Sequence, residues 1–267
     1  MSCLSCHTQH LSADDERSLE DWADDQLGKG MRGDQACVQC HGQEVYRTTA
    51  HTHHAPQSTG SRCYNCHMPH TTYGLLKGIR SHTVTSPTVA ETVSTGRPNA
   101  CNLCHLDQTL KWSARHLKEW YRVPQPKLSQ QQETVAAGVL WTTTGDAGLR
   151  ALAAWSMGWS PAIRASQKGW QAAYLAYLLD DPYDAVRHIA LRSLRRQPGF
   201  EKFVFDFVGA ADARPKAVQH ALDIWNQAAG QRQSSGALLI GEQGRLDDSR
   251  LQTLRDSRDD TRITLAE

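Results

Sequence analysis

The cysteines of this chain occur in four pairs that all have the same spacing. Two residues separate the members of each pair, and a histidine follows at once, as in Cys3–His7, Cys37–His41, Cys63–His67 and Cys101–His105. Two thiols three positions apart reach the two vinyl groups of one porphyrin, and the histidine that follows can ligate its iron. The pattern therefore predicts four covalent haem c groups, attached through Cys3, Cys6, Cys37, Cys40, Cys63, Cys66, Cys101 and Cys104.

Three other uses of paired cysteines fit this pattern less well. Four disulfides within C-x-x-C pairs would form an unusual scaffold. A structural zinc site would combine two pairs into one Cys₄ set, and iron–sulfur clusters use other spacings. None of these sites requires a histidine directly after every pair, so we prefer haem for all four motifs.

Histidines outside the motifs are the expected second axial ligands. Methionine is a poor candidate because the chain has four in all, and Met68 follows His67 too closely to reach the far face of the same haem. The surplus of histidines favours bis-histidine ligation at most haems. Low reduction potentials should follow, because it is methionine ligation that raises them. Seven histidines are available in this half of the chain: His10, His51, His53, His54, His70, His82 and His116.

We predict a distal ligand at four of these positions and leave open which haem each one serves. His10 is too near His7 to cross its own haem but can ligate a neighbouring one. His51 and His54 are three residues apart and share one face of a helical turn. His70 is a less favoured candidate. The predicted iron ligands are His7, His41, His67, His105, His10, His51, His54 and His82.

Composition limits the classes of protein to which the chain can belong. The net charge is +1 over 267 residues, which gives no whole-chain argument for nucleic acid or an anionic membrane as a partner. No apolar run approaches the roughly 18 residues of a membrane span, so a soluble chain is expected. Haem c is attached outside the cytoplasm, so we expect a periplasmic or extracellular protein. Because Met1 and Ser2 leave no room for a signal peptide before Cys3, we expect that one has been removed.

The haem motifs must be positioned by two kinds of structure. Glycine and proline recur through residues 1–125, where loops and short helices are expected around the macrocycles. Apolar residues then recur at helical spacing, for example at Phe200, Phe203, Val204 and Phe207, and predict helices with buried aromatic faces. An Asp-x-x-Arg pair at Asp184 and Arg187 has a looser echo at Asp146 and Arg150, at a separation near the roughly 40-residue period of HEAT repeats. We predict a mainly α fold with a loop-rich tetrahaem cytochrome c domain (1–125), a HEAT-like helical repeat domain (126–230) and a polar C-terminal tail (231–267).

Three segments resemble a group of bacterial exported multihaem cytochromes. These proteins join a doubled CxxCH haem domain to HEAT-type or tetratricopeptide repeats. The resemblance rests on Cys63–Tyr73, Arg80–His82 and Pro98–Trp112, and it covers about residues 37–121. It implies an exported redox protein with mainly bis-histidine haems, and it suggests His51, His54 and His82 as ligands. The sequence departs from the family pattern at residues 74–77.

Electron transfer is the leading functional hypothesis. Filled axial positions exclude substrates, so the protein would space and tune its haems and relay electrons between other cytochromes or redox proteins, without catalytic residues. The helical repeats would supply a surface for docking or self-assembly. Two alternatives stay open. One is an oxidoreductase with one open haem that acts on a small nitrogen or oxygen species. The other is a haem subunit of a respiratory complex or an extracellular cytochrome polymer.

Overall fold

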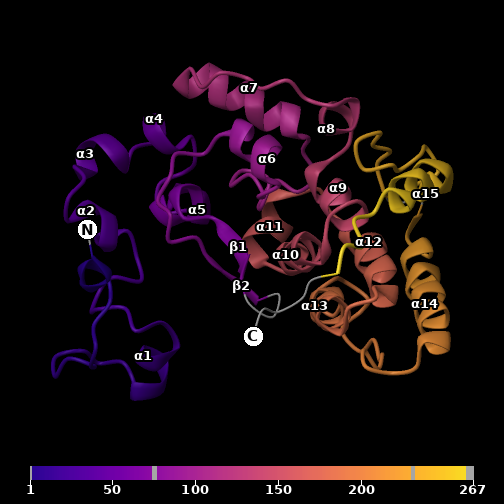
Figure 1. The fold of residues 1–267 in the computed structure, drawn as a ribbon, viewed down its shortest axis with the longest axis horizontal. Coiled ribbons are helices and arrows are strands. Elements are labelled where there is room, and N and C mark those ends of the chain that lie inside the picture. The colour runs from indigo at the N-terminus through magenta and orange to yellow at the C-terminus, as the bar shows by residue number, and fades with distance from the viewer. Residues whose placement is uncertain (1, 74–76, 230–231, 263–267) are drawn as a thin grey trace. The chain divides into compact units, whose positions relative to one another are not determined.

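Backbone contacts divide the chain into two units, residues 1–68 and residues 69–267. The computed structural model describes residues 2–73, 77–229 and 232–262 (Figure 1). The first three haem motifs belong to the first unit, and the fourth belongs to the second. Helices predominate in both units, so the predicted mainly α fold is confirmed. The boundary expected after residue 125 falls within the second unit, and the three-domain division stays a prediction.

The first unit is built from short helices joined by loops, as the frequent glycines and prolines predict. Hydroxyl groups cap two of these helices. The Ser18 side chain accepts a hydrogen bond from Asp21 N–H, and the Thr48 side chain accepts one from His51 N–H. The elements of this unit, in which η denotes a 3₁₀ helix, are η1 (Cys3–Ser5), α1 (Leu19–Asp25), α2 (Gln35–Val38), α3 (Gln43–Tyr46), α4 (Thr49–Thr52), η2 (Thr59–Ser61) and α5 (Cys63–His67).

Apolar burial is scarce in the first unit. Among the described residues of this unit, Trp22 is the one buried large hydrophobic side chain. Burying one such side chain contributes about 2 kcal/mol, whereas ordering each residue costs about 1 kcal/mol or more. The polypeptide alone therefore lacks the apolar core that a unit of this length needs.

The second unit begins with a two-stranded hairpin and continues as a helical assembly. Strand β1 (His70–Tyr73) pairs antiparallel with β2 (Lys77–Arg80), with His70 opposite Arg80. Residues 74–76, in the loop where the sequence departs from the resembled family, lie outside the described residues. The helices are α6 (Val89–Thr95), α7 (Leu110–Tyr121), α8 (Gln130–Thr134), α9 (Ala137–Thr143), α10 (Ala147–Met157), α11 (Ser160–Ala165), α12 (Gln171–Tyr177), η3 (Leu178–Asp180), α13 (Asp184–Leu194), η4 (Ala211–Ala213), α14 (Arg214–Asn226) and α15 (Asp248–Asp256).

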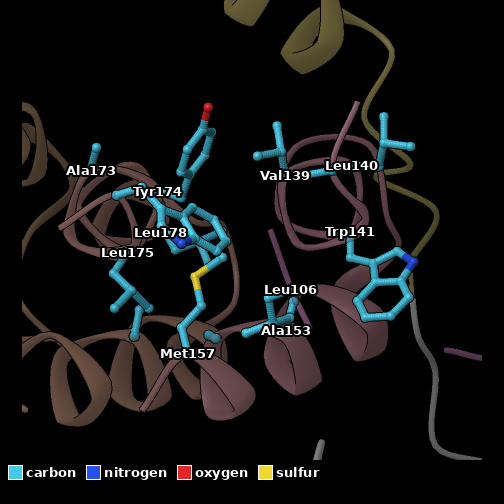
Figure 2. Packing of buried hydrophobic residues seen from close by; sticks show 14 of the residues in the cluster. Leu106, Val139, Leu140, Trp141, Ala153, Met157, Ala173, Tyr174, Leu175 and Leu178 are labelled. Atoms are coloured by element: carbon cyan, nitrogen blue, oxygen red, sulfur yellow. The ribbon is translucent and has the colours of Figure 1, made fainter. Parts of the chain in front are cut away.

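One apolar core joins these helices. Helix α10 packs against α9, α13 and the hairpin, and α12 packs against α13 and α14. Leu106, which directly follows the fourth haem motif, is fully buried among side chains of this core (Figure 2). Gly138 permits this packing, because a Cβ atom there would lie 2.9 Å from the Leu106 carbonyl oxygen. The fourth motif is thereby anchored to the core of the second unit.

Two segments differ from their expected structure. No helix forms at residues 200–207, so that prediction is wrong. The loop buries Phe200 and Phe203 but leaves the Val204 side chain 85% exposed. Residues 235–256, expected within a polar tail, turn back between Ser235 and Ile240 and bury Leu238 and Leu239 in the core. Their sparse apolar side chains are enough to fix the segment because they all face inward.

A buried ion pair links α10 to the turn before α13. Arg150 Nε and Nη2 donate to the Asp181 carboxylate at 2.6 and 3.2 Å, and both side chains are fully buried. Arg150 Nη1 also donates to the carbonyl oxygens of Gly145 and Asp259. Removing one member of a buried pair leaves the other charge uncompensated, which costs far more than the pair itself contributes.

Replacing Asp181 by alanine is therefore expected to lower the free energy of unfolding of the second unit by about 3–5 kcal/mol. Urea unfolding followed by circular dichroism measures this change. The matched control is Glu133→Ala, which removes an exposed ion pair with Lys111 and should cost less than about 1 kcal/mol. Equal losses in the two variants would contradict the structural role of the buried pair.

Candidate functional site

All four cysteine motifs adopt the same helical turn. The histidine N–H donates to the first cysteine carbonyl oxygen at 2.8 Å for His7, 3.0 Å for His41 and 2.9 Å for His105, and the third motif forms helix α5. All eight cysteines remain thiols in the structure, with no disulfide among them. One turn thus presents two thiols and a histidine within the span of a single porphyrin, which is what covalent haem attachment requires.

Zinc does not fit the described side chains as well as haem does. Within residues 2–73, 77–229 and 232–262, no three histidine, cysteine, aspartate or glutamate side chains converge as a metal-binding group. A structural zinc site needs four such ligands around one point. A haem supplies four of the iron ligands itself, so the protein has to provide at most one ligand on each face.

The first motif holds its histidine in a defined orientation. His7 Nδ1 lies 3.0 Å from the carbonyl oxygen of Asp25, at the end of α1. A carbonyl only accepts hydrogen bonds, so Nδ1 carries the proton and the lone pair is on Nε2. Metal-ligating histidines commonly donate their second ring N–H to a backbone carbonyl in this way.

Two predicted distal ligands show the same arrangement. His54 Nδ1 donates to Thr52 O at 2.6 Å, and His82 Nδ1 donates to Arg80 O at 3.1 Å. The His54 ring also lies directly against Gly60, where a Cβ atom would approach the His54 ring to 2.1 Å. Both histidines therefore have the tautomer that ligation through Nε2 requires.

His51 lies opposite the proximal histidine of the third motif. The rings of His51 and His67 are parallel within 2°, and their centres are 6.3 Å apart. A metal bound about 2 Å from one nitrogen of each imidazole separates the ring centres by about 6 Å. Burial, followed by the nearby His67 and His53, lowers the pKa of His51, which favours the neutral ring that ligation needs. The spacing of the two rings agrees with the predicted role of His51 as an axial ligand.

The first three motifs are tied to one another in chain order. Gln39 Nε2 in the second motif donates to Ser5 O in the first at 2.9 Å. The Cys37 thiol is hydrogen-bonded to the Cys63 thiol, which lowers the pKa of Cys37 to about 7 and raises that of Cys63. These contacts place consecutive haem attachment points side by side in the first unit.

The fourth motif is held by buried amide and hydroxyl groups of the second unit. Asn102 is fully buried, and its side chain donates to Gln108 O at 3.0 Å and accepts from Ser113 Oγ at 2.6 Å. Ser166 Oγ donates to Cys104 O at 3.0 Å. The ring of Trp112 packs 5.0 Å from that of His105. The proximal ligand of this motif is therefore set in a rigid frame.

The remaining histidines occupy different environments. His10 is exposed, and His53 ends helix α4 in a left-handed conformation. The His70 ring lies beside those of Trp155 and Trp159, with ring centres 4.3 and 5.4 Å away, and burial lowers the pKa of His70 to about 3. The ligand roles of His10, His51, His54 and His82, like those of the four motif histidines, stay predictions.

Some residues that shape these sites carry no sequence signal of their own. Gly60 stands among other loop glycines. Tyr46 lies edge-on to both His41 and His51, with ring centres 5.6 and 5.3 Å away. Asp34 is a single buried acid near the second motif. Their contacts depend on how the loops fold back, which residue spacing does not encode.

A family comparison agrees with this geometry. The model of the cytochrome c552 family matches residues 43–160, which include the third and fourth motifs and His51, His54 and His82. The match covers less than half of the chain and supports a c-type cytochrome. The match supports covalently bound haem c and electron transport as its chemistry. No curated protein and no solved structure matches this chain. Among the described residues, no helix has both the length and the apolar character to cross a membrane.

Replacing His51 by glycine is expected to remove one axial ligand from the third haem of this cytochrome. One low-spin ferric signal should then be replaced by a high-spin signal in the electron paramagnetic resonance spectrum, and added imidazole should restore the low-spin signal. His53→Gly is the matched control, because its left-handed backbone accepts glycine without strain. An unchanged low-spin spectrum in the His51 variant would exclude this residue as a ligand.

Proposed function

We propose that this cytochrome is an exported tetrahaem electron carrier. Its haems are mostly bis-histidine ligated and of low potential, and they relay electrons between redox partners. The opposed rings of His51 and His67, parallel and 6.3 Å apart, carry the proposal. An iron with both axial positions filled by imidazole exchanges electrons but offers no position to a substrate.

The contacts within the first unit support a relay. Electron transfer between haems needs them close together, and the attachment cysteines Cys37 and Cys63 touch through their thiols. Gln39 ties the second motif to the first. The protein would space the haems through these contacts and tune them through burial and hydrogen bonds to the axial histidines.

Partners and location follow from the chemistry of haem c. Its covalent attachment outside the cytoplasm supports a periplasmic or extracellular location. The donor and acceptor would be other cytochromes or redox proteins. The helices of residues 126–230, which we take as HEAT-like repeats, would offer an extended surface for docking or self-assembly.

The carrier and the alternative oxidoreductase differ in whether any iron has an open position. The carrier should give a wholly low-spin spectrum when oxidised, and carbon monoxide should leave the spectrum of the reduced protein unchanged because it needs an open iron. Optical titration with carbon monoxide, alongside electron paramagnetic resonance, measures both properties. A high-spin haem that binds carbon monoxide would contradict the carrier and identify the site of an oxidoreductase.

A further inference from the structure

A buried carboxylate connects the second and third haem attachment segments. Asp34 lies just before α2, and its side chain is 4% exposed. Although it stands at the N-cap position of α2, its side chain makes no capping bond there. Asp34 Oδ1 instead accepts a hydrogen bond from Cys63 N–H, at 3.1 Å, across 29 residues of chain.

This bond caps the helical turn of the third motif. Helix α5 begins at Cys63, and the residue at its own N-cap, Arg62, makes no side-chain capping bond. An acidic group at a helix N-terminus satisfies an N–H group and favours the positive end of the helix dipole. Asp34 therefore positions the turn that carries Cys63 and His67 while belonging to the segment that carries Cys37.

Two cations accompany the carboxylate. Asp34 Oδ2 lies 3.4 Å from Arg62 Nη1 and 3.7 Å from Arg47 Nε, and both arginine side chains are partly exposed. The thiols of Cys37 and Cys63 touch beside this group. Consequently the charge on Asp34 lies at the junction of two haem attachment points, where it offsets part of the positive charge of the arginines.

We propose that Asp34 is a positioning residue for the second and third haems and that its charge lowers their reduction potentials. The proposal rests on the proposed tetrahaem carrier. Adding an electron to a haem is disfavoured by a nearby negative charge, and local net charge is one of the factors that set the potentials of such centres. The same carboxylate thus fixes the third attachment turn and biases the flow of electrons through the pair.

The decisive variant is Asp34→Asn in the full, haem-loaded chain. Asparagine keeps an oxygen to accept the Cys63 N–H bond but removes the charge. In a spectroelectrochemical titration, the midpoint potentials of two haems should rise. At a fixed applied potential, the ratio of reduced to oxidised haem at these two sites should increase about tenfold. That change equals about 59 mV for one electron. Asp34→Glu, which restores the charge, should move the potentials back towards those of the parent chain.

Two further variants complete the test. Asp14→Asn neutralises an exposed acid of the same unit, paired with Lys29 at 3.2 Å, and should leave every potential unchanged. Arg62→Gln removes a cation from the junction and should lower the potentials of the same two haems. If the Asp34→Asn potentials match those of Asp14→Asn, the inference is wrong. If the Asp34→Asn variant fails to mature, Arg62→Gln decides the question. Midpoint potentials that are not lower in Arg62→Gln than in the parent chain would then overturn the inference.

The parent chain separates this inference from the function on which it rests. If the parent itself carries no haem, the proposed carrier fails along with the inference. If the parent is fully loaded and its potentials do not respond to the charge of Asp34, the inference fails and the carrier stands.

Discussion

Each haem motif is one turn of helix, closed by a hydrogen bond from the histidine N–H to the carbonyl of the first cysteine. The turn must persist for both thiols and the imidazole to reach the same porphyrin. A single turn has little stability of its own, because nucleating a helix fixes several residues for one hydrogen bond. The surrounding chain must therefore hold these turns, and most of the described contacts near the motifs do so.

The two units hold their motifs by different means. In the second unit, Leu106 and Asn102 join the fourth motif to a large apolar core and a buried hydrogen-bond network. In the first unit, Gln39 and Asp34 tie three motifs to one another. Among the described residues of this unit, Trp22 is the one large hydrophobic side chain that is buried. In the proposed carrier, such a unit would gain its apolar interior from the macrocycles. Cofactor attachment and folding would then be coupled there, as they are in small metal-dependent domains.

The sequence was informative where the signal is local. Apolar periodicity after residue 125 predicted helices, and α12, α13 and α14 form there. The periodicity at residues 200–207 misled, because Phe200 and Phe203 are buried from a loop and Val204 is exposed. Short apolar patterns do not distinguish a helix from an irregular segment that also faces a core.

Long-range pairings could not be predicted in this way. Seven histidines outside the motifs were candidates for the distal positions, so spacing alone did not reveal that the rings of His51 and His67 lie parallel and 6.3 Å apart. The bonds of Asp34 to Cys63 and of Arg150 to Asp181 span 29 and 31 residues. Which buried acid meets which base or N–H group depends on the packing of the whole unit. These pairings nevertheless determine the orientation of the ligands and the local charge.

Intact mass spectrometry of the matured protein, combined with titration of its thiols, tests the central claim most directly. The account predicts a 29.7 kDa polypeptide that is heavier by four covalently bound haems and has no reactive thiol after denaturation. A colourless chain of unmodified mass with eight titratable thiols would contradict it.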